Sequence, residues 1–188
     1  MADRERIGIE PTIRLREAGV GDAEAVAALH ASNWRSTYRG IFPDRYLDEE
    51  VDAERLAHWS ARLGDPAAAE RVLLAESDEG LAGFVCTVAD AEPPWGLLVD
   101  NLHVAQSAQG MGLGVRLLES AAALADMRGT GMFLFVYAGN APARVFYARR
   151  SGAEVERFEE EVPGGGTTET IRVAWTADQC ALGLASIG

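Results

Sequence analysis

Lysine is absent from this sequence. All 17 basic residues are arginine, against 29 aspartates and glutamates, which gives a formal net charge of −12. Without lysine the chain cannot carry a P-loop, whose Gly-Lys-Ser/Thr motif uses a lysine to hold phosphates. The acidic balance repels a phosphate backbone, so we expect no nucleic-acid partner. The same charge attracts cationic ligands such as amines, although it also suits a surface that only keeps the protein in solution.

Metal and disulfide chemistry have few residues to draw on. There are two cysteines, Cys86 and Cys180, and three scattered histidines, His30, His58 and His103. Neither set has the spacing of a disulfide framework or of a zinc site. We therefore expect no structural disulfide and no metal.

Long apolar runs are lacking as well. No stretch approaches about 18 continuous apolar residues, so we expect no membrane span. Residues 1–10 are charged and have no apolar core of the kind that a signal peptide needs, so we expect a cytoplasmic protein. The composition, with 48% apolar and 24% charged residues, is that of an ordinary globular protein.

The apolar periodicity predicts one α/β domain. Strands are expected at 12–16, 71–75, 81–88, 97–104, 132–136, 153–161 and 168–175, and helices from 22, over 44–64, from about 115 to 127 and over 140–152. This order indicates a mixed layer structure over residues 12–175, after a polar leader at 1–11 and before an unassigned C-terminal tail at 176–188. The last strand, 168–175, is a candidate pairing edge for a homodimer.

Gly110, Gly112 and Gly114 lie between a predicted strand and a predicted helix. A glycine cluster implies unusual backbone angles or a close approach of the backbone, and a helix N-terminus presents free N–H groups. Together these features make a phosphate cradle, although a tight turn without a ligand is the alternative. The dinucleotide-binding fingerprint does not fit, because its glycine spacing differs and three strands already precede the turn.

Here the sequence resembles the GNAT superfamily of acyl-CoA-dependent N-acyltransferases. Gln109, Gly112 and Gly114 match its Gln/Arg-x-x-Gly-x-Gly/Ala pattern, and the segment 102–104 is similar to the strand end that precedes this pattern in the family. A second motif, on a downstream helix, is matched by Asn140, Phe146, Tyr147 and Gly152. Two motifs in the right element order make the resemblance specific over roughly residues 12–175.

The resemblance implies a fold and a co-substrate. The fold is a central mixed, mostly antiparallel sheet of about seven strands, flanked by about four helices and splayed between the fourth and fifth strands. The co-substrate is acetyl-CoA, with its pyrophosphate on the backbone of Gln109, Gly110, Met111, Gly112, Leu113, Gly114 and Val115. Its pantetheine arm is implied to lie against Leu102, His103, Val104 and Asn140. Arg144, Arg149 and Arg150 either reach the CoA phosphates or lie on a solvated face.

Catalytic roles follow from the same resemblance. Tyr147 matches the tyrosine that protonates the leaving thiolate, although it also fits a core aromatic on an amphipathic helix. Asp100 resembles the carboxylate base of the family, and His103 is a rival with a better-matched intrinsic pKa. Water, or no dedicated base at all, is the third alternative.

The acceptor pocket is implied between the first two helices. Trp34, Tyr38 and Phe42 are its candidate residues, and their rings offer stacking or cation–π contacts, although Trp34 also fits a core position. Arg35 and Arg39 suggest a carboxylate on the substrate, but surface arginines are common.

We therefore expect an N-acetyltransferase that moves an acetyl group from acetyl-CoA to a primary amine of a small molecule or peptide, by direct attack in a ternary complex. An acyl-CoA-binding regulatory module without catalysis is one alternative. An interaction domain with an empty turn is another, and O-acyl transfer is a variant within the enzyme class.

Overall fold

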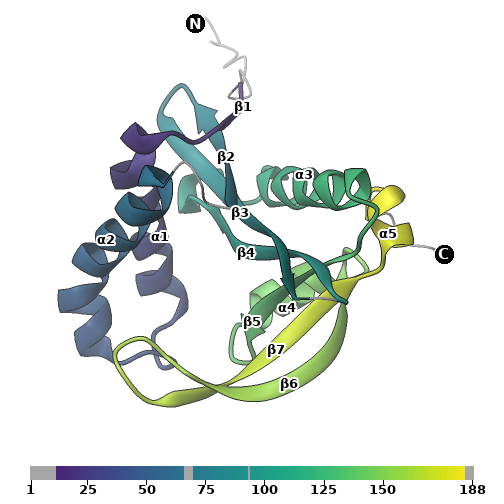
Figure 1. Cartoon of the computed structure of the whole chain (residues 1–188). Helices are drawn as coiled ribbons and strands as arrows, with labels where there is room; N and C mark the ends of the chain where they lie inside the picture. The colour runs from purple at the N-terminus through teal and green to yellow at the C-terminus, as the bar shows by residue number, and fades with distance from the viewer. Residues whose placement is uncertain (1–11, 66–69, 93, 185–188) are drawn as a thin grey trace, which may run out of the picture.

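Seven strands form a single sheet in the order β1-β2-β3-β4-β5-β7-β6 (Figure 1). The computed structural model describes residues 12–65, 70–92 and 94–184. The strands are β1 (Arg14–Glu17), β2 (Glu70–Ser77), β3 (Gly80–Glu92), β4 (Gly96–Val104), β5 (Met132–Tyr137), β6 (Ala153–Glu161) and β7 (Thr167–Trp175). Neighbours pair antiparallel except for β4 and β5, so the predicted mixed, mostly antiparallel sheet is confirmed.

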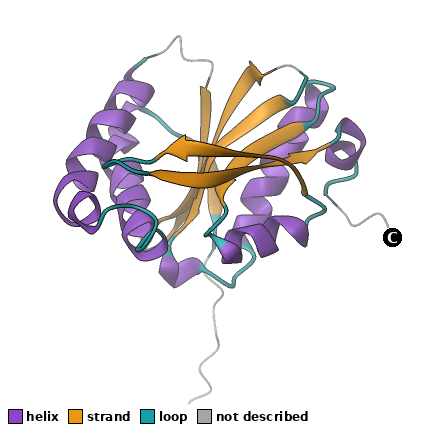
Figure 2. Cartoon of the chain, turned by 90° about the horizontal axis from the view of Figure 1, so that it is seen from below, coloured by secondary structure: helices purple, strands orange, loops and turns teal. Residues whose placement is uncertain are grey.

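Helices cover both faces of this sheet (Figure 2). They are α1 (Ala23–Thr37), α2 (Val51–Gly64), α3 (Leu113–Met127), α4 (Ala141–Ala148) and α5 (Ala177–Ala181). Short helical turns precede α1, α2 and α3: η1 (Val20–Asp22), the π-turn η2 (Tyr46–Glu50) and η3 (Gln106–Ala108).

The strands alternate their side chains between two cores. From β5, Met132, Leu134 and Val136 pack with α3 in the larger core. From β3, Phe84 and Cys86 turn the other way and pack with α1 and α2 around Trp59. Because side chains alternate with a period of two, each strand feeds both layers and holds α1 and α3 on opposite faces.

The sheet opens at its only parallel pair. β4 and β5 are in register only at Leu97↔Met132 and Leu98↔Phe133, and beyond these positions the described strands diverge. A register shift opposite Cys86 and Thr87 leaves Asp100 as an extra residue in β4, which is a β-bulge. The splay between the fourth and fifth strands is therefore present, and it exposes one edge of β4.

One expectation about the C-terminal part is wrong, and the structure adds an element there. The strand at 168–175 is not a free edge, because β7 lies between β5 and β6 and both of its edges are paired. The segment after Trp175, which the sequence left unassigned, contains α5 from Ala177, and Cys180 on α5 and Leu184 after it pack in the larger core.

α4 ends at Ala148, before the end of the helix expected over 140–152. The residue in the left-handed conformation is Ser151, with φ +62°, and not Gly152. Gly152 is required for space instead, because a Cβ there would lie 2.6 Å from the Trp175 side chain and 2.7 Å from Val173. The Gly152 N–H donates to the Tyr147 carbonyl at 3.0 Å, so this close approach fixes where α4 sits on the sheet.

No helix in the described ranges is both long enough and apolar enough to cross a bilayer.

Two substitutions at the end of α4 should have opposite effects on stability. Gly152→Ala overpacks Trp175 and should lower the free energy of unfolding by about 1–3 kcal/mol. Ser151→Gly relieves a left-handed residue and should raise it by up to about 1 kcal/mol. Urea denaturation measures both, and a Gly152→Ala midpoint equal to that of the unchanged protein would contradict the packing assignment.

Candidate active site

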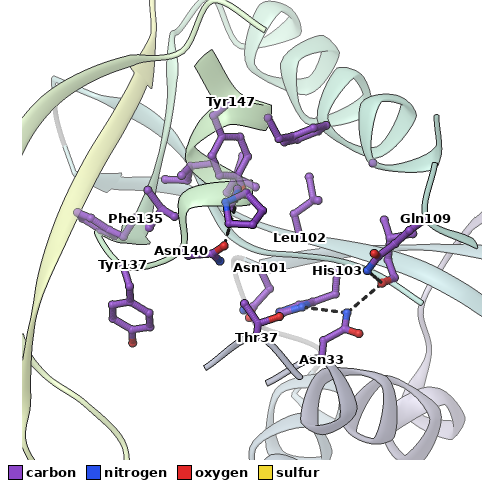
Figure 3. Close-up of a pocket in the computed structure, with 18 of the residues that line it drawn as sticks. Asn33, Thr37, Asn101, Leu102, His103, Gln109, Phe135, Tyr137, Asn140 and Tyr147 are labelled. Atoms are coloured by element: carbon purple, nitrogen blue, oxygen red, sulfur yellow. Dashed lines mark hydrogen bonds between the residues drawn. The ribbon is translucent and has the colours of Figure 1, made fainter. Parts of the chain in front are cut away.

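A cavity of about 1080 Å³ lies in the opening between β4 and β5. Its walls come from α1, β4, the glycine-rich turn, the start of α3, β5 and α4. Figure 3 shows Tyr147 and Asn140 on one side, Leu102, His103 and Gln109 on another, and Asn33 and Thr37 projecting from α1. The splay thus gathers side chains that lie far apart in the sequence.

The exposed edge of β4 presents backbone groups to this cavity. The Ala105 N–H donates to the carbonyl of Ala82, a residue of β3, at 2.8 Å. Along a strand, alternate residues direct their backbone groups to the same side. Leu102 and Val104 therefore point their N–H and C=O groups away from β3 and into the opening. An extended ligand could pair with them as an added strand.

The Val104 carbonyl shows this direction, because it accepts two side chains from outside the sheet. Asn33 Nδ2 donates to it at 3.1 Å and Gln109 Nε2 at 3.5 Å. The first bond fixes the orientation of the Asn33 amide, so its second N–H, 3.4 Å from His103 Nδ1, is a donor there. His103 then carries its own proton on Nε2, and burial lowers the pKa of its ring to about 4.

The glycine-rich turn ends at an uncapped helix. Gly112 is the N-cap of α3, with φ +75°, and no side chain caps its N–H groups. The N–H groups of Gly112, Leu113 and Gly114 have no acceptor within the helix, whereas that of Val115 bonds back to the Gly112 carbonyl at 3.1 Å. Free N–H groups at a helix N-terminus next to a cavity are suited to an anion such as phosphate.

α4 and its N-cap bring Tyr147 and Asn140 to the cavity, beside Tyr38 from the end of α1. Asn140 caps the helix by accepting from the Ala143 N–H at 3.3 Å, and its side chain is also hydrogen-bonded to Tyr38. Tyr147, about two turns further along, is 9% exposed and packs against Trp175. Burial raises the pKa of Tyr147, so its phenol stays protonated at neutral pH.

Asp100 lines the cavity but is already engaged. Its Oδ2 accepts from Arg62 at 2.5 Å and from the Asn101 amide at 2.6 Å. Arg62 comes from α2 and also pairs with Glu70. The carboxylate is therefore part of an ion-pair network that joins α2 to the sheet. Across the described residues, no group of acidic, histidine and cysteine side chains is placed to hold a metal ion.

The cavity brings together most of the residues that the sequence singles out. Among them, Trp34, Tyr38, Asp100, Leu102, His103, Val104, Gln109, Gly110, Gly112, Leu113, Gly114, Val115, Asn140 and Tyr147 line it. Phe42 and Met111 do not. Phe42 is 3% exposed in a cluster with Tyr46 and Leu47, and Met111 projects into solvent at 47% exposure.

The arginines between the first two helices are not free for a substrate carboxylate. Arg39 pairs with Asp44 at 2.9 Å and also with Asp48, while Arg35 pairs with Asp52. Neither arginine lines the cavity. The suggestion of a substrate carboxylate held by these two residues is therefore wrong.

Arg149 and Arg150, after the end of α4, behave differently. Both line the cavity, and within the described ranges neither forms an ion pair, although eleven other arginines do. The Nε of Arg150 is buried without a hydrogen-bond partner. In so acidic a protein, two free guanidinium groups beside a cavity are suited to an anionic ligand.

Sequence reasoning missed a group of residues on the last three strands. Tyr137 from β5, Glu160 from β6 and Thr170 from β7 also line the cavity. The alternation along one strand shows which of its residues lie on the same face, but it says nothing about the neighbouring strand. Only the pairing of β5 with β7 and of β7 with β6 brings these three side chains together. For Asn33 the sequence shows only a polar residue within the apolar pattern of the first helix, and it does not indicate the contacts with Val104 and His103.

The comparisons with known proteins agree with this geometry. The model of the acetyltransferase (GNAT) family matches residues 30–153. A protein described as a probable N-acetyltransferase, Rv2775 of Mycobacterium tuberculosis, is 32% identical over 142 residues, covering 73% of this chain and 78% of that protein. The uncharacterized N-acetyltransferase YuaI of Bacillus subtilis is 27% identical over 157 residues, covering 81% of this chain and 87% of its own.

Solved structures give the same fold. The PaiA N-acetyltransferase of Thermoplasma acidophilum, in complex with coenzyme A, superposes with a TM-score of 0.66 at 17% identity, covering 87% of this chain and 99% of its own. At that identity the likeness speaks for the fold alone.

Two glycine substitutions should separate the turn from its surroundings. Gly112→Ala places a residue with a Cβ in the left-handed region, which costs about 1–2 kcal/mol. We expect the backbone to shift to relieve this strain, and the shift would displace the free N–H groups. We expect its dissociation constant for coenzyme A, measured by titration calorimetry, to rise by about tenfold or more. Gly114→Ala is the matched control, because its Cβ would meet Phe146 and Val104 at 3.5–3.7 Å, an ordinary contact distance. Equal affinities in the two variants would contradict the cradle assignment.

Proposed function

Because this chain belongs to the acetyltransferase (GNAT) family, we propose that it transfers the acetyl group of acetyl-CoA to a primary amine of a small molecule or peptide. Membership makes the chain an acyl-CoA N-acetyltransferase with acetyl-CoA as co-substrate, whereas the acceptor and the roles of individual residues are our proposal. One observation carries it: the free edge of β4 and the uncapped N-terminus of α3 face the same cavity.

The residues present fit acetyl-CoA along its length. The N–H groups of Gly112, Leu113 and Gly114 would hold the pyrophosphate. Arg149 and Arg150 would reach the phosphates as the cationic partners that the ion-pair network leaves free. The backbone edge at 102–104 would pair with the amides of the pantetheine arm, and this requires no lysine.

Two groups of this chain then act on the transfer. When bound, acetyl-CoA supplies an activated acetyl thioester. The Leu102 N–H points into the cavity and would donate to the carbonyl oxygen as negative charge develops there. Tyr147 would donate its phenolic proton to the departing sulfur, which suits a buried phenol that is neutral at pH 7.

The acceptor amine has to lose a proton, and neither candidate base is free to take it. Asp100 is held by Arg62, and the Nδ1 lone pair of His103 accepts from Asn33. This argues against both side chains as the base. We propose that the amine attacks in its neutral form within a ternary complex and releases its proton to water.

The alternative is a non-catalytic module that binds acyl-CoA. It would use the turn and the edge of β4 but would need no phenol beside the splay. The position of Tyr147 on the cavity wall favours the enzyme, and the same geometry is compatible with O-acyl transfer as a variant.

Acetyl-CoA should stabilise the fold. A ligand at 100 times its dissociation constant adds about 2.7 kcal/mol. For a domain of this size that corresponds to a rise in melting temperature of roughly 5–10 °C. Differential scanning fluorimetry with and without acetyl-CoA measures it, with free adenine as the control ligand. An unchanged melting temperature with acetyl-CoA would overturn the proposed function.

Tyr147→Phe should lower turnover without weakening the binding of acetyl-CoA. The ring still packs against Trp175, but the proton donor is lost, and such groups contribute about 100-fold or more to rate. A thiol-release assay with an amine found in an acceptor screen gives kcat, and the thermal shift gives binding. Tyr46→Phe is the control, because this buried tyrosine bonds Glu54 and does not line the cavity. An unchanged kcat in Tyr147→Phe would remove the acid role.

A further inference from the structure

The cavity wall formed by the last hairpin carries a carboxylate without a cationic partner. Glu160 of β6 lines the cavity, and its Oε2 accepts from Thr170 Oγ1 at 2.8 Å. Thr170 is completely buried, so one oxygen of Glu160 is held at a fixed place on the sheet. In the part of the chain that the structure describes, no arginine forms an ion pair with Glu160.

The neighbouring acids lack this freedom. Asp100, the other acidic residue of the cavity wall in the described ranges, is neutralised by Arg62. On β6 itself, Glu154 pairs with Arg144 and Arg157, and Glu156 pairs with Arg172. Glu160 is thus the cavity acid whose charge the protein does not balance.

Tyrosine side chains lie near this carboxylate, which is itself exposed. Tyr137 pairs with Thr170 across β5 and β7, so its ring lies on the same face of the sheet as Thr170. Phe135 precedes it on that face, and Figure 3 shows both rings on the same side of the cavity. The Phe135 ring is already covered by the Arg172 guanidinium, whose Cζ lies 4.7 Å from the ring centroid, so Tyr137 is the ring that a ligand cation could contact. The Tyr38 ring lies 5.2 Å from that of Tyr137. After burial, the charge of Glu160 is the next largest factor that raises the pKa of Tyr137, which reports their proximity.

A carboxylate flanked by aromatic rings is a binding site for an organic cation. Arg149 and Arg150 lie beyond the C-terminal end of α4. Tyr38, whose ring neighbours that of Tyr137, meets Asn140 at the N-terminal end, so Glu160 belongs to this second end. The cavity therefore has a positive and a negative end along α4. An anionic co-substrate and a cationic acceptor would each find the opposite charge.

We propose that Glu160, held by Thr170 and lying near Tyr137, anchors a positively charged group of the acceptor. The acceptor would then carry two basic nitrogens, one that is acetylated and a second that stays protonated at Glu160. This inference rests on the proposed function and adds the class of acceptor to it: a diamine or a longer molecule with a distal ammonium group.

Matched acceptors test the anchor. With the full chain and saturating acetyl-CoA, we expect kcat/KM for 1,4-diaminobutane to exceed that for butylamine by roughly ten- to a hundredfold, the contribution of a hydrogen bond between charged groups. Glu160→Gln keeps an oxygen for Thr170 but removes the charge. This variant should raise KM for the diamine, so that kcat/KM becomes similar for the two amines. The kcat/KM of butylamine and the KM of acetyl-CoA should stay unchanged.

Glu159→Gln is the control variant. It lies next to Glu160 on β6 and loses the same charge, but its side chain is on the opposite face of the sheet. It should keep the preference for the diamine. An equal loss in both variants would mean that only the overall charge of the protein matters, and a preference retained in Glu160→Gln would overturn the anchor. A fall in kcat for both amines would also overturn it, because Glu160 would then act on the reacting nitrogen.

Binding without turnover separates this inference from the proposed function. Titration calorimetry of 1,4-diaminobutane into protein saturated with coenzyme A should give binding that Glu160→Gln loses and Glu159→Gln retains. Absence of that binding, or equal binding in all three proteins, would overturn the anchor even if acetyl-CoA stabilises the fold. Absence of stabilisation by acetyl-CoA would instead overturn the proposed function.

Discussion

The divergence of β4 from β5 is the constraint from which the site follows. The two strands share two residue pairs, and beyond them the backbone groups of Leu102 and Val104 face an opening where a strand would otherwise pair. Backbone groups without partners are costly when they are buried, so such an edge has to be met by water, side chains or a ligand. Asn33 and Gln109 meet one carbonyl, and the remaining groups would pair with the co-substrate in the binding mode that we propose. The uncapped start of α3 extends the same set of unpaired N–H groups to the surface.

The charges on the wall of this cavity are unevenly distributed. The chain has more acidic than basic residues, and most of the described arginines form ion pairs with acids. One of them is Arg62, whose ion pair with Asp100 connects α2 to the bulge of β4. In that setting an arginine left unpaired is as informative as an acid left unpaired. Arg149 and Arg150 on one side and Glu160 on the other are what remains on the cavity wall after the internal pairs are made. The unbalanced charges thus mark where charged ligands would complete the network.

Local signals in the sequence were enough for the elements and for much of the site. The glycine spacing placed the turn, and Asn140, which the downstream motif singled out, is the N-cap of α4, because both features depend on a few neighbouring residues. The features that the sequence did not reveal depend on distant residues. Nothing near Asp100 reveals that Arg62 will take its charge, and nothing near Glu160 reveals that the last hairpin brings it to the cavity. The central position of β7 likewise depends on the pairing of three strands, and not on its own apolar run.

The histidines show how this packing decides the proton chemistry. Trp59 Nε1 donates to His30 Nδ1 at 3.0 Å, so His30 carries its proton on Nε2, as His103 does opposite Asn33. The two rings lie 4.4 Å apart in a layer beneath β4, and burial lowers the pKa of both. A proton added to either ring would be repelled by nearby Arg55 and would have to break an existing hydrogen bond. These imidazoles are therefore neutral packing groups that support the strand end, and in the mechanism that we propose the proton of the amine leaves through solvent.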